Sequence, residues 1–447
     1  MSELSEEMIE KYTQSLNETP INKVLKDAIM TNGINGAALD NNSIVAMNPV
    51  FSEEIETGEV ANQKKSGRCW IFAALNTFRH KISERFNIKE DFELSQNYMM
   101  FWDKLEKSNY FLDSIIKTLE EPLDGRLLSW LLTHPQQDGG QWDMLVALVD
   151  KYGVVPKQVM PETYQSSQSK ELNSILDAKL RQCARDLRQS YEKEGKSKKE
   201  LEDAKINMLD DIYTILAFAL GEPPKTFDFE YRDKEGDFHS DENLSPQGFF
   251  KKYVEKNLDD YVSIINAPTK DKPYNKTYTV KFLGNVVNGR QIKYLNVDMK
   301  TLKALALEQI KDGETVWFGC DVSRYSDRKI GILDPDLYDY EAAFSTHFNL
   351  TKAERLDYKE SMLTHAMVLT GVNLLDGEPD RWKVENSWGE DVGHKGYFVM
   401  SDNWMDEYTY QIVINKKYLS GDLLKAWEQE PIELDPWDPM GSLALTK

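Results

Sequence analysis

The chain has 447 residues and carries 75 acidic against 54 basic side chains, a formal net charge of −21. This length leaves room for two or three domains, and a hydrophobic content of 40% is typical of a globular protein with a buried core. The acidic surface repels phosphate backbones and anionic lipid, which argues against nucleic acid or a membrane surface as partner.

The N-terminal stretch MSELSEEMIEKY is polar and lacks the apolar segment of a signal peptide. The three cysteines, Cys69, Cys183 and Cys320, show no CxxC spacing, which favours a reducing compartment over a disulfide framework or a zinc site. No apolar run is long enough to cross a bilayer. We therefore expect a cytoplasmic protein.

Residues 1–60 are expected to form an N-terminal arm without catalytic residues. A weak capping box that starts at Ser5 predicts a helix through about Ser15. The pairs Asn32-Gly33 and Asn35-Gly36 predict turns.

Residues 63–76 (QKKSGRCWIFAALN) combine a polar, glycine-containing turn with an apolar run that follows Cys69. The absence of charge in this run predicts a helix buried on most sides. Cys69 would then lie at a helix N-terminus, where unpaired N–H groups and the dipole favour a thiolate, and Lys64, Lys65 and Arg68 add positive charge. The alternative is that Cys69 is only a small buried hydrophobe.

The next segment predicts mainly helices. Ser95 is a candidate N-cap for one helix, a second is expected from about Tyr110 to Leu119, and a third follows Gly139-Gly140. In isolation the two glycines indicate only a loop before a helix.

The middle of the chain changes from helical to alternating patterns. Helical spacing up to Gly195 and a capping box at Ser197 predict a helical hairpin, with Cys183 on its apolar face. Further on, two alternating runs flank Asn288-Gly289, which indicates a β-hairpin.

From about residue 314 the pattern is rich in strands, and Cys320 is expected to be structural within one of them. One later strand begins with His365, and another ends at Asn386. A cysteine nucleophile needs a base and the base needs an orienting partner, and Cys69, His365 and Asn386 supply these three types.

The remaining histidines do not suggest a second centre. His80 would lie roughly 16 Å along the helix from Cys69, which is too far for a hydrogen bond. No two histidines have metal-ligand spacing, so we expect no metal and no cofactor.

Five motifs occur together in one order, and with them the sequence resembles the papain-like cysteine peptidases, specifically the bleomycin hydrolase and bacterial aminopeptidase C branch. The motifs are Gln63 with Cys69-Trp70, Leu94-Ser95-Gln96, Gly139-Gly140-Gln141-Trp142, Thr364-His365-Ala366, and Glu385-Asn386-Ser387-Trp388-Gly389 followed by Gly396-Tyr397. The tail Pro436-Trp437-Asp438-Pro439-Met440-Gly441 points to the same branch, and Ser66 stands where secreted members carry a disulfide cysteine.

The resemblance implies an α+β, papain-like two-lobed fold, with a helical lobe facing an antiparallel β-barrel-like lobe, a large mainly helical insertion and a C-terminal arm. We accordingly divide the chain into five predicted parts: the N-terminal arm (1–60), the helical catalytic lobe with Cys69 (61–164), the inserted region (165–312), the β-rich catalytic lobe with His365 and Asn386 (313–430), and the C-terminal arm toward the active site (431–447).

The resemblance also assigns roles. Cys69 is the nucleophile, His365 the proton carrier and Asn386 the residue that orients the imidazole, while the Gln63 amide contributes to the oxyanion hole. The substrate-binding residues implied are Gly139, Gly140, Trp388 and, at the end of the C-terminal arm, Lys447.

In this branch the tail lies in the enzyme's own cleft and its carboxylate pairs with the substrate's free α-amine, which implies an aminopeptidase acting on peptides and a homohexameric assembly. Residues 445–447 extend beyond the usual end, so an endopeptidase on the same scaffold remains the alternative. A catalytically silent scaffold or binding protein is the alternative from another class.

Overall fold

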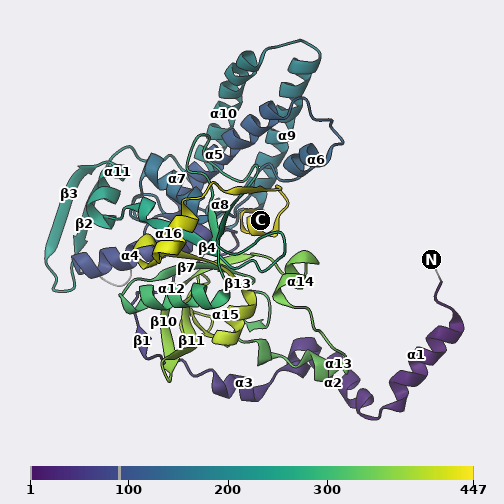
Figure 1. Ribbon diagram of the computed structural model, residues 1–447. Helices are drawn as coiled ribbons and strands as arrows, with labels where there is room; N and C mark the ends of the chain where they lie inside the picture. Colours follow the sequence, from purple (N-terminus) through teal and green to yellow (C-terminus); the bar gives the residue numbers. More distant parts are fainter. Residues whose placement is uncertain (1–2, 89–91, 446–447) are drawn as a thin grey trace.

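The computed structural model describes residues 3–88 and 92–445. Helices gather on one side of the molecule and a large mixed sheet on the other, with the N-terminal arm extending away from both (Figure 1). Among the described residues, no helix is both long enough and apolar enough to cross a membrane.

The helical side is built around α4 (Cys69–Phe86). The first ten residues of this helix are almost completely buried, and all of them except Asn76 are apolar or small. Its neighbours are α5 (Gln96–Lys117), α6 (Arg126–Thr133) and α7 (Trp142–Tyr152). Ser95 caps α5 as expected, by accepting a hydrogen bond from the Tyr98 N–H. The expectation of two helices here is wrong, because α5 is one helix of 22 residues whose polar side chains Asp103, Lys104 and Lys107 are buried and paired.

The predicted helical hairpin is present as α9 (Lys170–Glu192) and α10 (Lys198–Leu220), which project from the body in Figure 1. The Ser197 capping box opens α10, and Cys183 is buried on the inner face of α9. The short elements around this hairpin are α8 (Tyr164–Ser167), β2 (Phe227–Arg232), β3 (Phe238–Leu244), α11 (Pro246–Phe249), η1 (Phe250–Val254) and η2 (Leu258–Asp260).

The large sheet has the strand order β14-β5-β6-β4-β13-β7-β10-β11-β12-β9-β8, with β1 paired to β10. Its strands are β1 (Glu53–Glu54), β4 (Tyr261–Ile265), β5 (Lys276–Val280), β6 (Tyr294–Asn296), β7 (Val316–Cys320), β8 (Ser326–Asp327), β9 (Ile332–Leu333), β10 (His365–Leu375), β11 (Glu378–Glu385), β12 (Tyr397–Ser401), β13 (Thr409–Asn415) and β14 (Ile432–Leu434). Three pairs are parallel, namely β4 with β6, β5 with β14 and β9 with β12, so the sheet is mixed rather than purely antiparallel.

The predicted β-hairpin pairs β5 with β6, but these strands and β4 join the same sheet as β7. The predicted division at residue 312 therefore falls within one continuous sheet. The helices and turns that accompany the sheet are α12 (Met299–Lys311), η3 (Pro335–Leu337), α13 (Tyr340–Phe344), α14 (Lys352–Asp357), α15 (Asp402–Tyr408), η4 (Lys416–Tyr418) and α16 (Gly421–Trp427).

The N-terminal arm consists of α1 (Glu6–Glu18), α2 (Ile21–Ala38) and α3 (Asn41–Ala46). Ser5 caps α1 as predicted, and α1 buries none of its residues. Only one of the two predicted turns appears: Gly33, with φ +76°, kinks α2, whereas Asn35-Gly36 continues as helix.

The C-terminal arm returns to the body of the molecule. After β14 it forms the 3₁₀ segment η5 (Pro439–Leu445), so the expectation of a wholly extended tail is wrong in its last part. Residues 440–444 are buried, and Met440, Leu443 and Ala444 belong to the same apolar cluster as Cys69 and Ala366.

Candidate active site

Cys69 is the first residue of α4 and is only 2% exposed. The apolar residues that follow it fix the helix between the lobes: the Trp317 indole N–H donates to the Trp70 carbonyl at 3.2 Å. The backbone N–H of Ala366 lies close enough to the Cys69 sulfur to lower the pKa of its thiol. Because Ala366 follows His365 directly, this contact brings the start of β10 against the nucleophile.

His365 is the first residue of β10, opposite Cys320 on β7, and Asn386 follows the last residue of β11. The two side chains meet because β10 and β11 are neighbours in the sheet. His365 Nε2 and Asn386 Oδ1 are 2.9 Å apart, and an amide oxygen can only accept, so Nε2 carries the proton. The other ring nitrogen, Nδ1, therefore keeps its lone pair and can act as a base.

Burial controls the charges of both groups. It raises the pKa of the Cys69 thiol to about 11, against the lowering effect of the backbone N–H groups of Ala366, Trp70 and Cys69. Burial also lowers the pKa of His365 to about 4, against the hydrogen bond to Asn386, and the charge of Arg328 lowers it further. Because both groups are buried, the pair is neutral thiol and neutral imidazole near pH 7, and the expectation that the helix N-terminus favours a thiolate at Cys69 is wrong for this structure.

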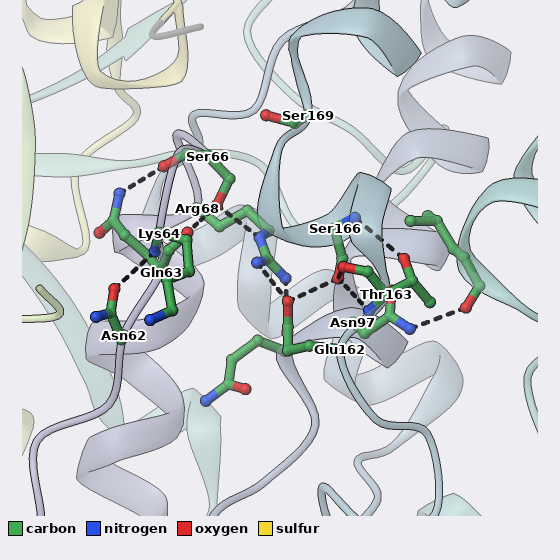
Figure 2. A network of polar contacts seen from close by, with 12 residues as sticks. Asn62, Gln63, Lys64, Ser66, Arg68, Asn97, Glu162, Thr163, Ser166 and Ser169 are labelled. Atoms are coloured by element: carbon green, nitrogen blue, oxygen red, sulfur yellow. Dashed lines mark hydrogen bonds and ion pairs between the residues drawn. The ribbon is translucent and has the colours of Figure 1, made fainter. Parts of the chain in front are cut away.

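The expectation that Arg68 supplies positive charge to the sulfur is wrong. Arg68 is the N-cap of α4, but its guanidinium turns away and forms two hydrogen bonds with Glu162, at 2.9 and 2.7 Å (Figure 2). Glu162 also accepts from the Ser166 hydroxyl at 2.7 Å. Arg68 thus fixes the loop before Cys69 rather than ionising the thiol.

Gln63 lies at the start of this loop and is 6% exposed. Its side-chain amide donates one N–H to the Ser66 carbonyl at 2.6 Å, and its carbonyl oxygen accepts from the Ser387 hydroxyl at 2.5 Å. A carboxamide has two N–H donors, so one remains for an oxyanion. Its predicted role in the oxyanion hole stays a prediction, and the bond to Ser387 adds a link between the loop and the segment after Asn386.

Trp388 packs on the His365 ring, with centroids 4.9 Å apart, and the Arg328 guanidinium lies 4.5 Å from the Trp388 centroid. This placement shields the His365–Asn386 hydrogen bond from water. Substrate binding by Trp388 stays a prediction.

Gly139 and Gly140 form no strand. A Cβ on Gly140 would lie 2.5 Å from the Trp70 ring, which explains why glycine is needed there. The Gly139 carbonyl accepts from the Lys107 ammonium at 2.6 Å. These contacts fix the loop against α4, and pairing of the glycines with a peptide stays a prediction.

A buried ionic cluster behind Asn386 was missed from the sequence. Glu385, 1% exposed, is in contact with three residues of α4: it accepts from Asn76 at 2.9 Å and from Arg79 at 2.8 Å, and its second oxygen lies 2.9 Å from His80 Nε2. The cluster joins the nucleophile helix to the strand that ends at Asn386. A helical period places residues 76, 79 and 80 on one face, but nothing in the sequence names their partner.

The C-terminal arm contacts both the helical side and the sheet side near this site. The Met440 carbonyl accepts from the Gln141 amide at 3.3 Å and from the Tyr294 hydroxyl at 3.2 Å. The Ser442 hydroxyl donates to the carbonyl of Leu363, two residues before His365, at 2.8 Å. Lys447, the predicted end of the arm, lies outside the described residues.

The described residues contain no group of three or more histidine, cysteine or acidic side chains that could hold a metal ion. The chemistry at hand is that of a thiol, an imidazole and an amide, supplied by two facing halves of an α+β fold. This arrangement defines a papain-like cysteine peptidase.

Comparisons with known proteins agree with this class. The profile of the Peptidase C1-like family matches residues 3–441. Aminopeptidase C of Listeria monocytogenes is 56% identical over 99% of this chain and 100% of its own length, and bleomycin hydrolase of Gallus gallus is 47% identical over 86% of each. The crystal structure of PepW from Lactobacillus rhamnosis HN001 superposes with a TM-score of 0.97 at 57% identity, covering 98% of this chain and 99% of that one.

The chain therefore belongs to the Peptidase C1-like family and is a cysteine-type peptidase. The resemblance to the bleomycin hydrolase and aminopeptidase C branch and the papain-like fold class are both confirmed. A catalytically silent scaffold finds no support, because Cys69, His365 and Asn386 are all present and the last two are correctly paired.

Proposed function

We propose that this enzyme is a cytoplasmic cysteine aminopeptidase that removes residues from the N-terminus of peptides. The observation that carries the proposal is the C-terminal arm, whose buried residues 440–444 lie between Gln141 of the helical side and Leu363 of the sheet side. We expect an arm in this position to close one end of the substrate site and to leave room for only the first residue of a peptide beyond Cys69. The relatives named aminopeptidase C support the same reading.

In the first half of the reaction, His365 Nδ1 takes the Cys69 proton as the sulfur attacks the carbonyl carbon of the first peptide bond. The negative oxygen of the tetrahedral intermediate accepts hydrogen bonds from the free N–H of Gln63 and from the backbone N–H of Cys69. Loss of one such donor typically raises the barrier by about 3 kcal/mol. The intermediate collapses, the C–N bond breaks, and the imidazolium gives its proton to the leaving amine.

In the second half, His365 takes a proton from water, and the resulting hydroxide attacks the thioester. The C–S bond breaks, the amino acid leaves with a new carboxyl group, and the sulfur regains its proton. Asn386 accepts from Nε2–H throughout, which holds the imidazole in one orientation and leaves Nδ1 as the nitrogen that exchanges the proton. The buried site stays neutral before and after each turnover, in keeping with the pKa directions of both groups.

The test compares an aminoacyl fluorogenic amide with its N-acetylated form. We expect the free amine to be cleaved at least a hundredfold faster, and a variant lacking residues 440–447 to lose this preference. Faster cleavage of the acetylated substrate by the full chain would establish the endopeptidase alternative instead.

Assembly into a homohexamer is also proposed. The arm helix α1 exposes apolar side chains, among them Ile9, Tyr12 and Leu16, and extends away from the body in Figure 1. Burial of that face against another copy would remove it from water. Light scattering on the 51.7 kDa chain should give about six times the monomer mass, and a monomer would refute the assembly.

The cytoplasmic location is supported by the three cysteines, which are all free. Fractionation of the source cells, with immunodetection of the enzyme, would test it: we expect the protein in the cytoplasmic fraction.

A further inference from the structure

A hollow of about 820 Å³ borders the loop that leads to Cys69. One wall is the loop itself, through Lys64, Lys65 and Ser66, and the other is the beginning of α9, from Ser169 to Asp177. Figure 2 shows Ser66 and Ser169 on these two segments. The Ser66 carbonyl is the acceptor of the Gln63 amide, so the hollow adjoins the residues that position the reacting bond.

The hollow has an excess of unpaired positive charge in a chain whose net charge is −21. Lys64, Lys65 and Lys170 line it, and none of them has a carboxylate within ion-pair distance among residues 3–88 and 92–445. Its two acidic residues leave the lysines in excess: the exposed Glu171 accepts from the Gln165 amide at 3.3 Å, and Asp177 accepts from the Gln136 N–H at 3.0 Å and has Arg181 3.7 Å away. Three ammonium groups are thus free to meet an anion.

The polar groups of α9 add to this. The Ser169 hydroxyl donates to Asp138 and provides no cap, so the positive end of this 23-residue helix lacks a side-chain acceptor. Asn173, also in the lining, is 6% exposed, and its Nδ2 donates to Asp138 at 2.9 Å. Its Oδ1 has no hydrogen-bond partner in the described structure, although a buried acceptor normally has one. A bound peptide offers both a carboxylate for the lysines and an N–H for Asn173.

The position of the hollow relative to the C-terminal arm indicates which part of a bound peptide would occupy it. The arm contacts Gln141, Tyr294 and Leu363, and no described arm residue lines the hollow. If the arm holds the N-terminal residue of a substrate, the hollow is left for the part of the peptide that follows the cleaved bond.

We propose that this hollow is a subsite for a carboxylate on the leaving part of the peptide, and that Lys64, Lys65 and Lys170 make the enzyme prefer short peptides carrying one. The proposal rests on the proposed aminopeptidase function. The carboxylate is either the C-terminus of a di- to tetrapeptide or an acidic side chain after the cleaved bond.

The test uses Ala-Ala-Ala as free acid and as C-terminal amide, and the amides of Ala-Ala-Glu and Ala-Ala-Gln. The first pair reports on a terminal carboxylate and the second on an acidic side chain. We expect kcat/KM to favour the anionic member of at least one pair. Combined Lys64→Met, Lys65→Met and Lys170→Met substitutions should reduce that ratio by roughly tenfold, because each exposed charge pair contributes a few-fold. Raising the salt to 0.5 M should reduce it as well.

The matched control is Lys300→Met, which removes an exposed lysine on α12 without altering the hollow. It should leave the ratio unchanged. Using a ratio also separates this role from a general effect on the sulfur, which would slow both members of a pair equally.

Calorimetry on the Cys69→Ala enzyme measures binding of the same peptides without turnover. Tighter binding of the anionic member, lost in the triple lysine variant, supports the subsite. Equal binding of both members of both pairs, or a ratio that survives the triple substitution, overturns it. Absence of any cleavage by the unaltered enzyme would refute the proposed function, while the calorimetric comparison would still decide the subsite.

Discussion

The two sides of the catalytic centre are held in different ways. On the helical side, the loop before Cys69 is fixed by side chains: Arg68 pairs with Glu162, and the Gly67 N–H donates to Asp138 at 2.9 Å. On the sheet side, His365 and Asn386 sit at strand ends, and β10 is paired along its length with β7 and β11. A single substitution can therefore displace the nucleophile, whereas on the sheet side it removes chemistry but leaves the backbone in place.

The Glu385 cluster is where the two kinds of support meet. Its carboxylate comes from the end of β11, and its partners Asn76, Arg79 and His80 come from α4. Burial alone would raise the pKa of Glu385. The charges and hydrogen bonds of His80 and Arg79 outweigh this effect, so the pKa of Glu385 is lowered. The buried Glu385 carboxylate thus holds α4 and the end of β11 at a fixed distance from each other.

The largest of the three effects we predict is that of Asn386→Ala, on the sheet side. Without the acceptor for Nε2–H, the imidazole loses its orientation, and kcat should fall about a hundredfold while the unfolding free energy changes little. Steady-state kinetics and urea denaturation check both halves of this expectation. A fall in stability large enough to explain the lost activity would remove the contrast between the two sides.

On the helical side, Arg68→Met should destabilise the fold as well as the site. It leaves Glu162 without its main partner in a mostly buried position, which we expect to cost about 2–3 kcal/mol in urea denaturation. Arg185→Met, which breaks an exposed pair with Asp186, is the matched control and should cost under about 0.5 kcal/mol. Equal losses of unfolding free energy in the two variants would show that the Arg68–Glu162 pair does not stabilise the fold.

The smallest effect is the fall of activity at low pH, which tests whether His365 is neutral in the working enzyme. The pKa of His365 lies at about 4, below its ordinary value, so the imidazole is neutral and able to act as base above that pH. We expect kcat/KM to fall about tenfold per pH unit only below about pH 4, measured in brief assays at pH values where the fold persists. An acid limb near pH 6.5 would mean that His365 is not desolvated in the working enzyme.

The centre itself was predictable because its residue types and their neighbours are local: a glycine turn before Cys69, a strand opening at His365, a strand closing at Asn386. What failed depended on long-range partners. Arg68 is the last residue of the polar turn before Cys69, but its carboxylate partner is 94 residues away in the sequence. Likewise the single helix α5 depends on buried pairs with distant loops, and the 3₁₀ end of the tail depends on Gln141 and Leu363.

The most direct test of the central claim is alkylation by iodoacetamide, followed by peptide mass spectrometry. Cys69, Cys183 and Cys320 are all buried and free, so each serves as a reference for the others. We predict that Cys69 reacts first, that one label per chain abolishes peptidase activity, and that His365→Ala slows this labelling at least tenfold. Full activity in enzyme carrying a label on Cys69, or labelling of Cys69 that is indifferent to His365, would contradict the account.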